Sequence, residues 1–299
     1  MLTGLAATWV ALACSPEQGQ PRPKVLLIGI DGVRPDILAE VDTPNLDALI
    51  EGGAYSDRAR TTRPTVSGPG WSSMLTGVWP DKHGVTSNDF SGSRYERFPD
   101  FLTRIESLRP ELRTFAVADW MPLVGDDSGG PLIGAAPDVK HVLNGYEVGW
   151  READSLSTEI AVQELGSADP DALFVYLGNP DETSHHHGSI GVEYREAIRE
   201  ADRRVGQLVE AIRAREGDGT EDWLILVSTD HGRRMDGGHG GDSEEEFRIF
   251  FLASGPSAVQ GRLEGTPRIV DVAVTALAHL GFQPEPAWEL DGSAVGLRR

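Results

Sequence analysis

Short runs of apolar, often β-branched residues alternate with longer amphipathic segments from Lys24 onward. Such runs suit strands that are buried on both faces, because neither face of these strands meets water. Strands that alternate with helices form a largely parallel sheet with helices packed on both sides. The sequence therefore predicts an α/β fold of three layers, α/β/α, around a largely parallel central sheet. The expected strands are residues 25–30, 114–117, 172–177, 223–227 and 249–252.

Helical periodicity is strongest over residues 192–215, where apolar residues recur at three- and four-residue spacing. The charged positions between them are expected on the solvated face of this helix. Residues 125–137 are rich in Gly, Asp and Pro, and they are expected to form a surface loop or a small lobe. Further helices are expected near residues 45–51, 99–108, 157–165 and 270–280.

The N-terminal residues differ from everything that follows. Residues 1–13 carry no charge and lead to Cys14, the single cysteine of the chain. This stretch is too short to span a bilayer, and it resembles a bacterial lipoprotein signal whose cysteine becomes the lipidated first mature residue. We therefore expect a signal and polar linker over residues 1–22 and a lipid anchor on the periplasmic side of the bacterial cell envelope. Because no basic residue precedes the apolar stretch, a plain secretory signal and a cytosolic N-terminus are the alternatives.

The chain is strongly acidic. Its 47 Asp and Glu residues outnumber the 27 Lys and Arg residues, which gives a formal net charge of −20 at pH 7. A charge of this sign repels the phosphate backbone of DNA and RNA and the surface of anionic membranes. We therefore expect no nucleic-acid polymer among the partners of this protein.

Carboxylates follow three of the expected strands. Asp31, Asp181 and Asp230 each lie just after one of the apolar runs. Open parallel sheets bind ligands beyond the carboxyl ends of their strands, so these side chains are the first candidates for a site. Taken alone, each Asp has an alternative interpretation as the N-cap of the next helix.

Histidines lie beside two of these carboxylates. His185 is four residues after Asp181, His231 follows Asp230 directly, and His239 lies within a run of glycines. Imidazole and carboxylate ligands, three to an ion with room left for substrate, are what catalytic zinc prefers. Glycines on both sides of His239 would let the backbone pass close to a metal ion. The spacing therefore favours a metal centre over isolated helix caps.

Ser67 is the candidate nucleophile. It stands where a helix can begin, with Pro69 in the first turn. The N-terminus of a helix stabilises an alkoxide or a phosphoryl oxygen, because its backbone N–H groups and its dipole favour negative charge. The alternative is that Ser67 is a simple N-cap serine.

These pieces appear in the order and spacing of the alkaline phosphatase superfamily, and the chain most resembles its nucleotide pyrophosphatase/phosphodiesterase branch. The resemblance runs from about Lys24 to the C-terminus. It implies a single alkaline phosphatase-like hydrolase domain over residues 23–299. The motifs that carry the resemblance are Ile30-Asp31-Gly32, Thr43-Pro44-Asn45-Leu46, the segment from Ser67 to Val85, Asn88, Asp181 with His185, Asp230-His231, His239 and Leu290-Asp291-Gly292.

The resemblance also implies a mechanism. The enzyme would hydrolyse a small phosphoester with two zinc ions, or with other divalent transition metals in their place. Ser67 would attack the phosphorus and form a phosphoseryl intermediate, which water then releases. Asn88 and backbone amides near Gly68 would donate to the nonbridging oxygens. One ion would be held by Asp181, His185 and His239, and the other by Asp31, Asp230, His231 and the Ser67 oxygen.

Other residues near these motifs have weaker assignments. Trp71, just after the nucleophile turn, is a candidate to stack on an aromatic leaving group of the substrate, and ordinary packing is the alternative. His83 is expected to be a structural hydrogen-bonding residue. His186 and His187 are expected to be exposed.

The chain departs from its relatives after His231. Only seven residues separate His231 from His239, where nucleotide pyrophosphatases usually carry a long insertion that helps to cover the site. Both monoester and diester substrates therefore stay open.

A sulfatase is the main alternative, since Ser67-Gly68-Pro69 resembles part of the sulfatase maturation motif, although Trp71 stands in place of its arginine. A phosphonate-cleaving hydrolase is a further alternative, and a catalytically silent surface lipoprotein that binds a ligand is an alternative of another class.

Overall fold

The computed structural model describes residues 20–215 and 219–298. The expected lipoprotein signal and Cys14 lie outside these residues. In the described part of the chain, eight strands form one sheet in the order β4-β3-β5-β1-β6-β7-β2-β8. The strands are β1 (Arg22–Ile30), β2 (Ala54–Arg60), β3 (Thr114–Ala118), β4 (Val139–Val142), β5 (Ala172–Leu177), β6 (Glu221–Ser228), β7 (Arg248–Ser254) and β8 (Gly261–Arg262).

The sheet is largely parallel, as the sequence predicts. β1 lies between β5 and β6 and pairs with both in parallel, and β3 pairs in parallel with β4 and β5. β7 is antiparallel to its two neighbours, β6 and β2. All five apolar runs of the sequence form strands, namely β1, β3, β5, β6 and β7.

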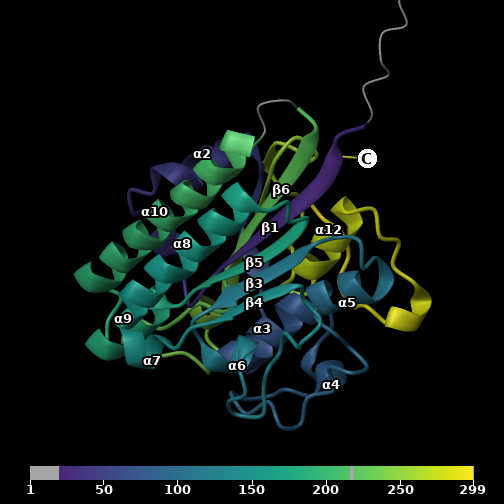
Figure 1. The fold of residues 1–299 in the computed structure, drawn as a ribbon. Helices are drawn as coiled ribbons and strands as arrows, with labels where there is room; N and C mark the ends of the chain where they lie inside the picture. The colour runs from purple at the N-terminus through teal and green to yellow at the C-terminus, as the bar shows by residue number, and fades with distance from the viewer. Residues whose placement is uncertain (1–19, 216–218, 299) are drawn as a thin grey trace, which may run out of the picture.

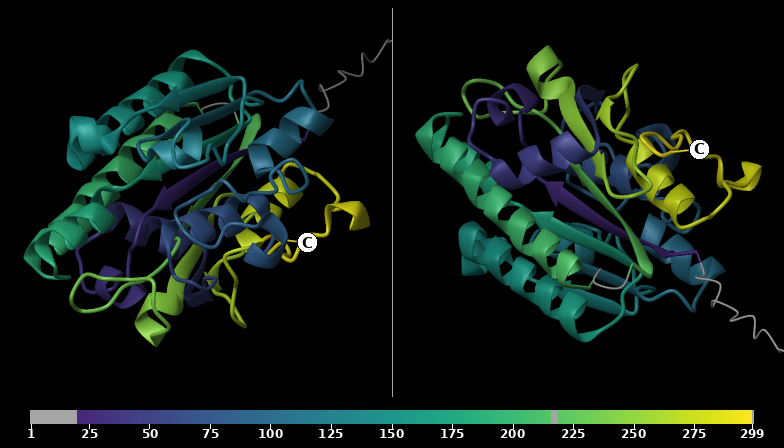
Figure 2. Two further views of the ribbon diagram at one scale, coloured as in Figure 1. Left: turned by 90° about the horizontal axis from the view of Figure 1, so that it is seen from below. Right: turned by 90° about the horizontal axis from the view of Figure 1, so that it is seen from above.

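Helices cover both faces of the sheet, which gives the predicted three layers (Figures 1 and 2). Leu26 and Ile28 of β1 belong to a core with residues of α2, α8 and α10. Val25 and Leu27, on the opposite face of the same strand, belong to a core with residues of α3, α5 and α12. The helices are α1 (Pro35–Leu38), α2 (Pro44–Gly52), α3 (Ser67–Thr76), α4 (Pro80–His83), α5 (Phe101–Leu108), α6 (Met121–Val124), α7 (Gly145–Val148), α8 (Trp150–Ser167), α9 (Asn179–His187), α10 (Val192–Arg215), α11 (Glu244–Phe247) and α12 (Asp271–His279), with a 3-10 turn η2 at Pro286–Trp288.

The helices that the sequence predicts are present, most of them with small differences in length, although α8 is much longer than expected. The strongest periodic segment forms α10 over the expected residues. α8 begins at Trp150, seven residues before the expected start at residue 157. Asp100 caps α5, because its side chain accepts hydrogen bonds from the backbone N–H groups of Leu102 and Thr103. Residues 125–137 contain neither helix nor strand, as expected of a surface loop.

The parallel order of the central strands decides where a site can form. β5, β1 and β6 are adjacent and point the same way, so their carboxyl ends meet at one edge of the sheet. Asp31, Asp181 and Asp230 follow these three ends. α3 packs against the same strands through Trp71, and it begins at Ser67. All four residues are therefore placed at one edge.

The close contact between β1 and α3 leaves no space for a side chain at Gly29. A Cβ atom on this residue would overlap the Trp71 ring, whereas a Cβ on Gly166 of α8 would meet nothing within 4 Å. We predict that Gly29→Ala lowers the free energy of unfolding by about 1–3 kcal/mol through overpacking. Gly166→Ala is the control, and it should raise this free energy by about 0.4–1 kcal/mol. Urea denaturation followed by circular dichroism, with metals chelated, measures both, and equal effects would contradict the prediction.

Candidate active site

Four of the predicted residues meet around the side chain of His231. The His231 Nε2 atom lies 3.5 Å from Asp31 Oδ1 and 3.3 Å from Asp230 Oδ2. The Ser67 Oγ atom lies 3.2 Å from the same nitrogen. Each of these residues is buried. We call Asp31, Ser67, Asp230 and His231 the buried cluster.

Three further predicted residues meet next to this cluster, closer to the surface. The Nε2 atoms of His185 and His239 lie 2.8 Å apart. Asp181 Oδ2 lies 3.2 Å from His185 Nε2, and Asp181 Oδ1 lies 3.7 Å from His239 Nε2. The ring of His239 stacks on that of His231 with centroids 3.8 Å apart, so the two groups are in direct contact. We call Asp181, His185 and His239 the outer cluster.

The two carboxylates of the buried cluster each have one oxygen held and one oxygen without a partner. Asp31 Oδ2 accepts hydrogen bonds from Trp71 Nε1 at 3.0 Å and from the Tyr176 hydroxyl at 2.7 Å. Asp230 Oδ1 accepts from the backbone N–H of Gly32 at 3.1 Å. Asp31 Oδ1 and Asp230 Oδ2 are buried and have no hydrogen-bond partner among the described residues. Buried carboxylate oxygens of this kind require a cation or a donor.

Two of the histidines are oriented in the same manner. His231 Nδ1 lies 2.9 Å from the carbonyl oxygen of Gly232, and His239 Nδ1 lies 2.9 Å from that of Thr65. A ring nitrogen that donates to a carbonyl carries the proton, so the Nε2 lone pair points into the clusters. Burial lowers the pKa of His231, and it lowers the pKa of His239 to about 2. Both rings are therefore neutral at pH 7, as metal binding requires.

The residues present fit divalent transition metals. Asp181, His185 and His239 offer ligand atoms that all lie within 4.8 Å of one another, and so do Asp31, Asp181 and His231. Burial, and then the charge of Asp31, raise the pKa of Asp230 well above its usual value. A cation between these two carboxylates would relieve their repulsion. Neutral imidazoles together with carboxylates form the ligand set that zinc prefers.

The structure places Ser67 where a nucleophile would be expected. It is the first residue of α3, and the preceding Val66 is in extended conformation. The backbone N–H of Gly68 donates to Asn88 Oδ1 at 2.8 Å. In this structure the Gly68 amide therefore holds Asn88, and the expectation that this amide binds substrate stays a prediction. With its oxygen engaged, Asn88 can present its N–H groups to a substrate.

A cavity of about 250 Å³ opens onto both clusters. Its wall contains residues that the sequence analysis did not select, namely Trp120, Tyr146, Tyr176 and Glu182. Trp120 could have been found, because it lies just after strand β3, at the same edge of the sheet as the other strand ends. The Tyr146 hydroxyl donates to Glu182 Oε1 at 3.1 Å. The full lining is Asp31, Ser67, Asn88, Trp120, Tyr146, Tyr176, Asp181, Glu182, His185 and His239.

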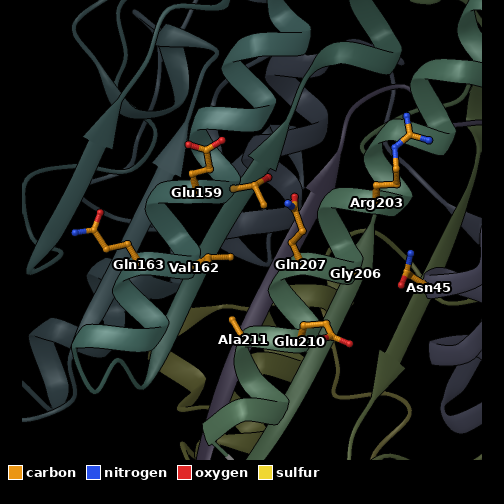
Figure 3. A pocket seen from close by; sticks show the side chains of 10 residues that line it. Asn45, Glu159, Val162, Gln163, Arg203, Gly206, Gln207, Glu210 and Ala211 are labelled. Atoms are coloured by element: carbon orange, nitrogen blue, oxygen red, sulfur yellow. The ribbon is translucent and has the colours of Figure 1, made fainter.

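A larger cavity lies elsewhere, between α8 and α10. Its volume is about 720 Å³, and Figure 3 shows Glu159 and Gln163 of α8 on one side and Arg203 and Gln207 of α10 on the other. None of the predicted site residues lines it. The candidate chemistry is therefore confined to the smaller cavity at the strand ends.

The expectation that Trp71 stacks on a leaving group is wrong. Its side chain is fully buried and packs edge-on against Phe174 and Tyr176. Its indole N–H donates to Asp31, so it supports a metal-ligand candidate from behind. Packing thus decides its position, as the alternative interpretation had it.

The remaining histidines lie as expected. His83 is buried, and its two ring nitrogens bond the Ser73 hydroxyl and the backbone N–H of Val85. His186 and His187 are exposed on α9.

One buried cation next to the outer cluster was missed. Arg233 is fully buried, and its guanidinium forms an ion pair with Asp181. Burial lowers the pKa of Arg233 to about 10, so the side chain is charged at pH 7. The sequence places Arg233 only two residues after Asp230-His231, which could have made it a candidate. Arginine is usually exposed, however, and its burial here depends on how the surrounding loops pack.

Comparison with known proteins identifies the family of this chain. The model of the type I phosphodiesterase/nucleotide pyrophosphatase family matches residues 25–108 and 115–234. These ranges contain each predicted site residue except Cys14 and His239. Human ectonucleotide pyrophosphatase/phosphodiesterase family member 7 is 28% identical over 88% of this chain and 63% of its own length. The chain thus spans less than two thirds of the length of this curated relative.

Solved structures show the same fold. Murine ectonucleotide pyrophosphatase/phosphodiesterase 5, in an inactive form in complex with AMP, superposes with a TM-score of 0.68 at 15% identity, covering 89% of this chain and 96% of that one. A 2-O glycosaminoglycan sulfatase superposes with a TM-score of 0.71 at 13% identity, covering 92% of this chain and 73% of that one. Since the family model matches well over half of its residues, the chain belongs to the type I phosphodiesterase/nucleotide pyrophosphatase family.

Proposed function

We propose that this protein hydrolyses phosphodiesters with Ser67 as the nucleophile and two divalent transition metals, zinc by preference, as cofactors. One observation carries the proposal. The Ser67 hydroxyl lies 3.2 Å from His231 Nε2, beside two buried carboxylate oxygens that have no hydrogen-bond partner among the described residues. A hydroxyl group therefore lies next to oxygen atoms that can bind a metal ion. Metal-dependent esterases form an alkoxide nucleophile from a hydroxyl in such a position.

The two clusters assign the ligands of each ion. The outer cluster would hold one ion, through Asp181, His185 and His239. The buried cluster would hold the other, through Asp31, Asp230, His231 and the Ser67 oxygen. When bound, the two ions would lower the pKa of the Ser67 hydroxyl and stabilise the departing oxygen of the substrate.

The side chains perform the remaining steps. The Ser67 oxygen attacks phosphorus in line, and the bond to the leaving group breaks, which yields a phosphoseryl intermediate and an alcohol. Asn88, held by the Gly68 amide, donates to a nonbridging oxygen as that oxygen gains charge. Water then attacks the phosphorus and returns Ser67 to the hydroxyl form.

The charges around the cavity favour a diester over a monoester. No Lys or Arg side chain of the described residues lines the cavity, and Asn88 is one of its neutral donors. A phosphate monoester carries about two negative charges at neutral pH, so cationic side chains beside the metals would favour its binding. A diester carries a single charge and needs none.

The sulfatase alternative is less well supported by the site. Trp71 stands where the sulfatase maturation motif has arginine, and it is buried against Asp31 rather than facing a ligand. The fold alone does not choose between the two chemistries, because a sulfatase and a phosphodiesterase superpose on this chain about equally well.

We also propose, from the sequence, that Cys14 carries a lipid and that the protein belongs to the bacterial cell envelope. None of the helices in residues 20–215 and 219–298 has the length and apolar character needed to cross a bilayer. An anchor at Cys14 would attach the domain of residues 23–299 to the membrane surface. If this is right, Cys14→Ser should abolish incorporation of radiolabelled palmitate in bacteria and release the protein from the membrane fraction. Palmitate labelling that persists in Cys14→Ser would contradict the anchor.

The choice of substrate can be measured directly. We predict that the purified protein contains about two zinc ions per chain. It should hydrolyse bis-p-nitrophenyl phosphate faster than p-nitrophenyl phosphate, p-nitrophenyl sulfate and a phenylphosphonate monoester. Initial rates on the four esters, with metal content by mass spectrometry, test this. A faster rate on the sulfate would sink the phosphodiesterase assignment, and no turnover of any ester would favour a binding protein.

The nucleophile has a matched control. Ser67→Ala removes the attacking oxygen and should lower kcat on the diester by a factor of about 10³ or more. Ser67→Thr keeps a hydroxyl at the same place and should retain measurable turnover. Both variants should unfold at temperatures close to that of the wild type. Near-normal turnover by Ser67→Ala would show that another group, such as Thr65 or water, attacks.

A further inference from the structure

The guanidinium of Arg233 is surrounded by hydrogen-bond acceptors from several segments of the chain. Its Nε atom donates to the carbonyl oxygen of Gly32 at 2.9 Å, and Nη1 donates to the carbonyl oxygens of Gly237 at 2.9 Å and Asp181 at 3.3 Å. Nη2 donates to Asp181 Oδ1. One side chain thus connects the segments that follow β1 and β5 to its own loop, which follows β6 and leads to His239.

Gly32 and Tyr194 pack closely around the Arg233 guanidinium. Gly32 has a φ of +64°, and a Cβ atom there would overlap Arg233 Nη2. The ring of Tyr194, from α10, lies 5.4 Å from the guanidinium carbon. The Tyr194 hydroxyl donates to the same Gly32 carbonyl at 2.8 Å. The guanidinium is therefore fixed from the backbone side and from the helix side.

The contacts of Arg233 are unequal between the two clusters. It forms an ion pair with Asp181 of the outer cluster. In the described part of the chain, it forms no ion pair with Asp31 or Asp230 of the buried cluster, and no other Lys or Arg does. With Oδ1 held by Arg233, Asp181 keeps Oδ2 turned toward His185 Nε2 at 3.2 Å.

We infer that Arg233 is a positioning residue for one of the two metal ions, the ion of the outer cluster. The inference rests on the proposed function, since it assumes that the clusters bind metal. Arg233 holds Asp181 and, through the Gly237 carbonyl, the loop that carries His239, so two of three ligands are aligned before the ion arrives. Groups that orient metal ligands in this way typically change metal affinity by about 10–100-fold when they are removed.

Zinc titration of the metal-free protein tests the inference without relying on activity. Calorimetry, with a chromophoric chelator as competitor, should show two ions bound to the wild type. Arg233→Met should bind one ion with unchanged affinity and the other about 10–100-fold more weakly. Arg233→Lys keeps the charge but loses the forked contacts, so it should show the same selective weakening to a smaller degree. This conservative variant answers the question if Arg233→Met does not fold.

Arg104→Met is the control. Arg104 is also buried, but it lies on α5 and its guanidinium packs over Trp288. This variant should bind both ions as the wild type does. Unchanged binding of both ions by the Arg233 variants, equal weakening of both, or tighter binding would each overturn the inference. A wild type that binds no zinc would instead overturn the proposed function itself.

Discussion

The site depends on one electrostatic constraint, which is the burial of three carboxylates at the ends of adjacent parallel strands. Asp31, Asp181 and Asp230 meet there because β1, β5 and β6 run side by side in the same direction. Like charges in a dry environment repel, and each is costly to keep ionised. The surrounding residues stabilise all three carboxylates in the same way. A donor fixes one oxygen of each carboxylate, and the other oxygen is left facing the histidines.

The sequence predicted the five apolar strands and missed β4, β2 and β8, which lie at or next to the two edges of the sheet. Strands such as β1 and β5 are covered on both faces, so their apolar runs are visible without any knowledge of tertiary structure. β2 reads Ala-Tyr-Ser-Asp-Arg-Ala-Arg, and β4 at the edge of the sheet is half-buried or exposed along its length. Such segments form strands because a neighbouring strand provides hydrogen-bond partners for their backbone. A local sequence pattern does not show this.

The site residues also separate into those that local sequence predicts and those that depend on tertiary contacts. Ligand candidates were predictable because strand ends and helical spacing are local, as with Asp181 and His185 on one face of α9. What lies behind or beside them was not. The sequence left stacking on substrate and ordinary packing open for Trp71, which packs inward and donates to Asp31. It gave no indication that Arg233 contacts the turn after β1, helix α9 and its own loop. Such roles follow from where distant segments meet rather than from spacing.

The wall of the cavity is divided between two kinds of chain segment. Every metal-ligand candidate comes from the strand ends, α3, α9 or the loop to His239. Trp120 and Tyr146, which face the same cavity, come from the stretch between β3 and α8, which supplies no ligand. Segments that connect the main strands and helices tolerate change more readily than those elements do. Within this fold, substrate preference can therefore diverge between species through residues 119–150 while the catalytic chemistry stays constant.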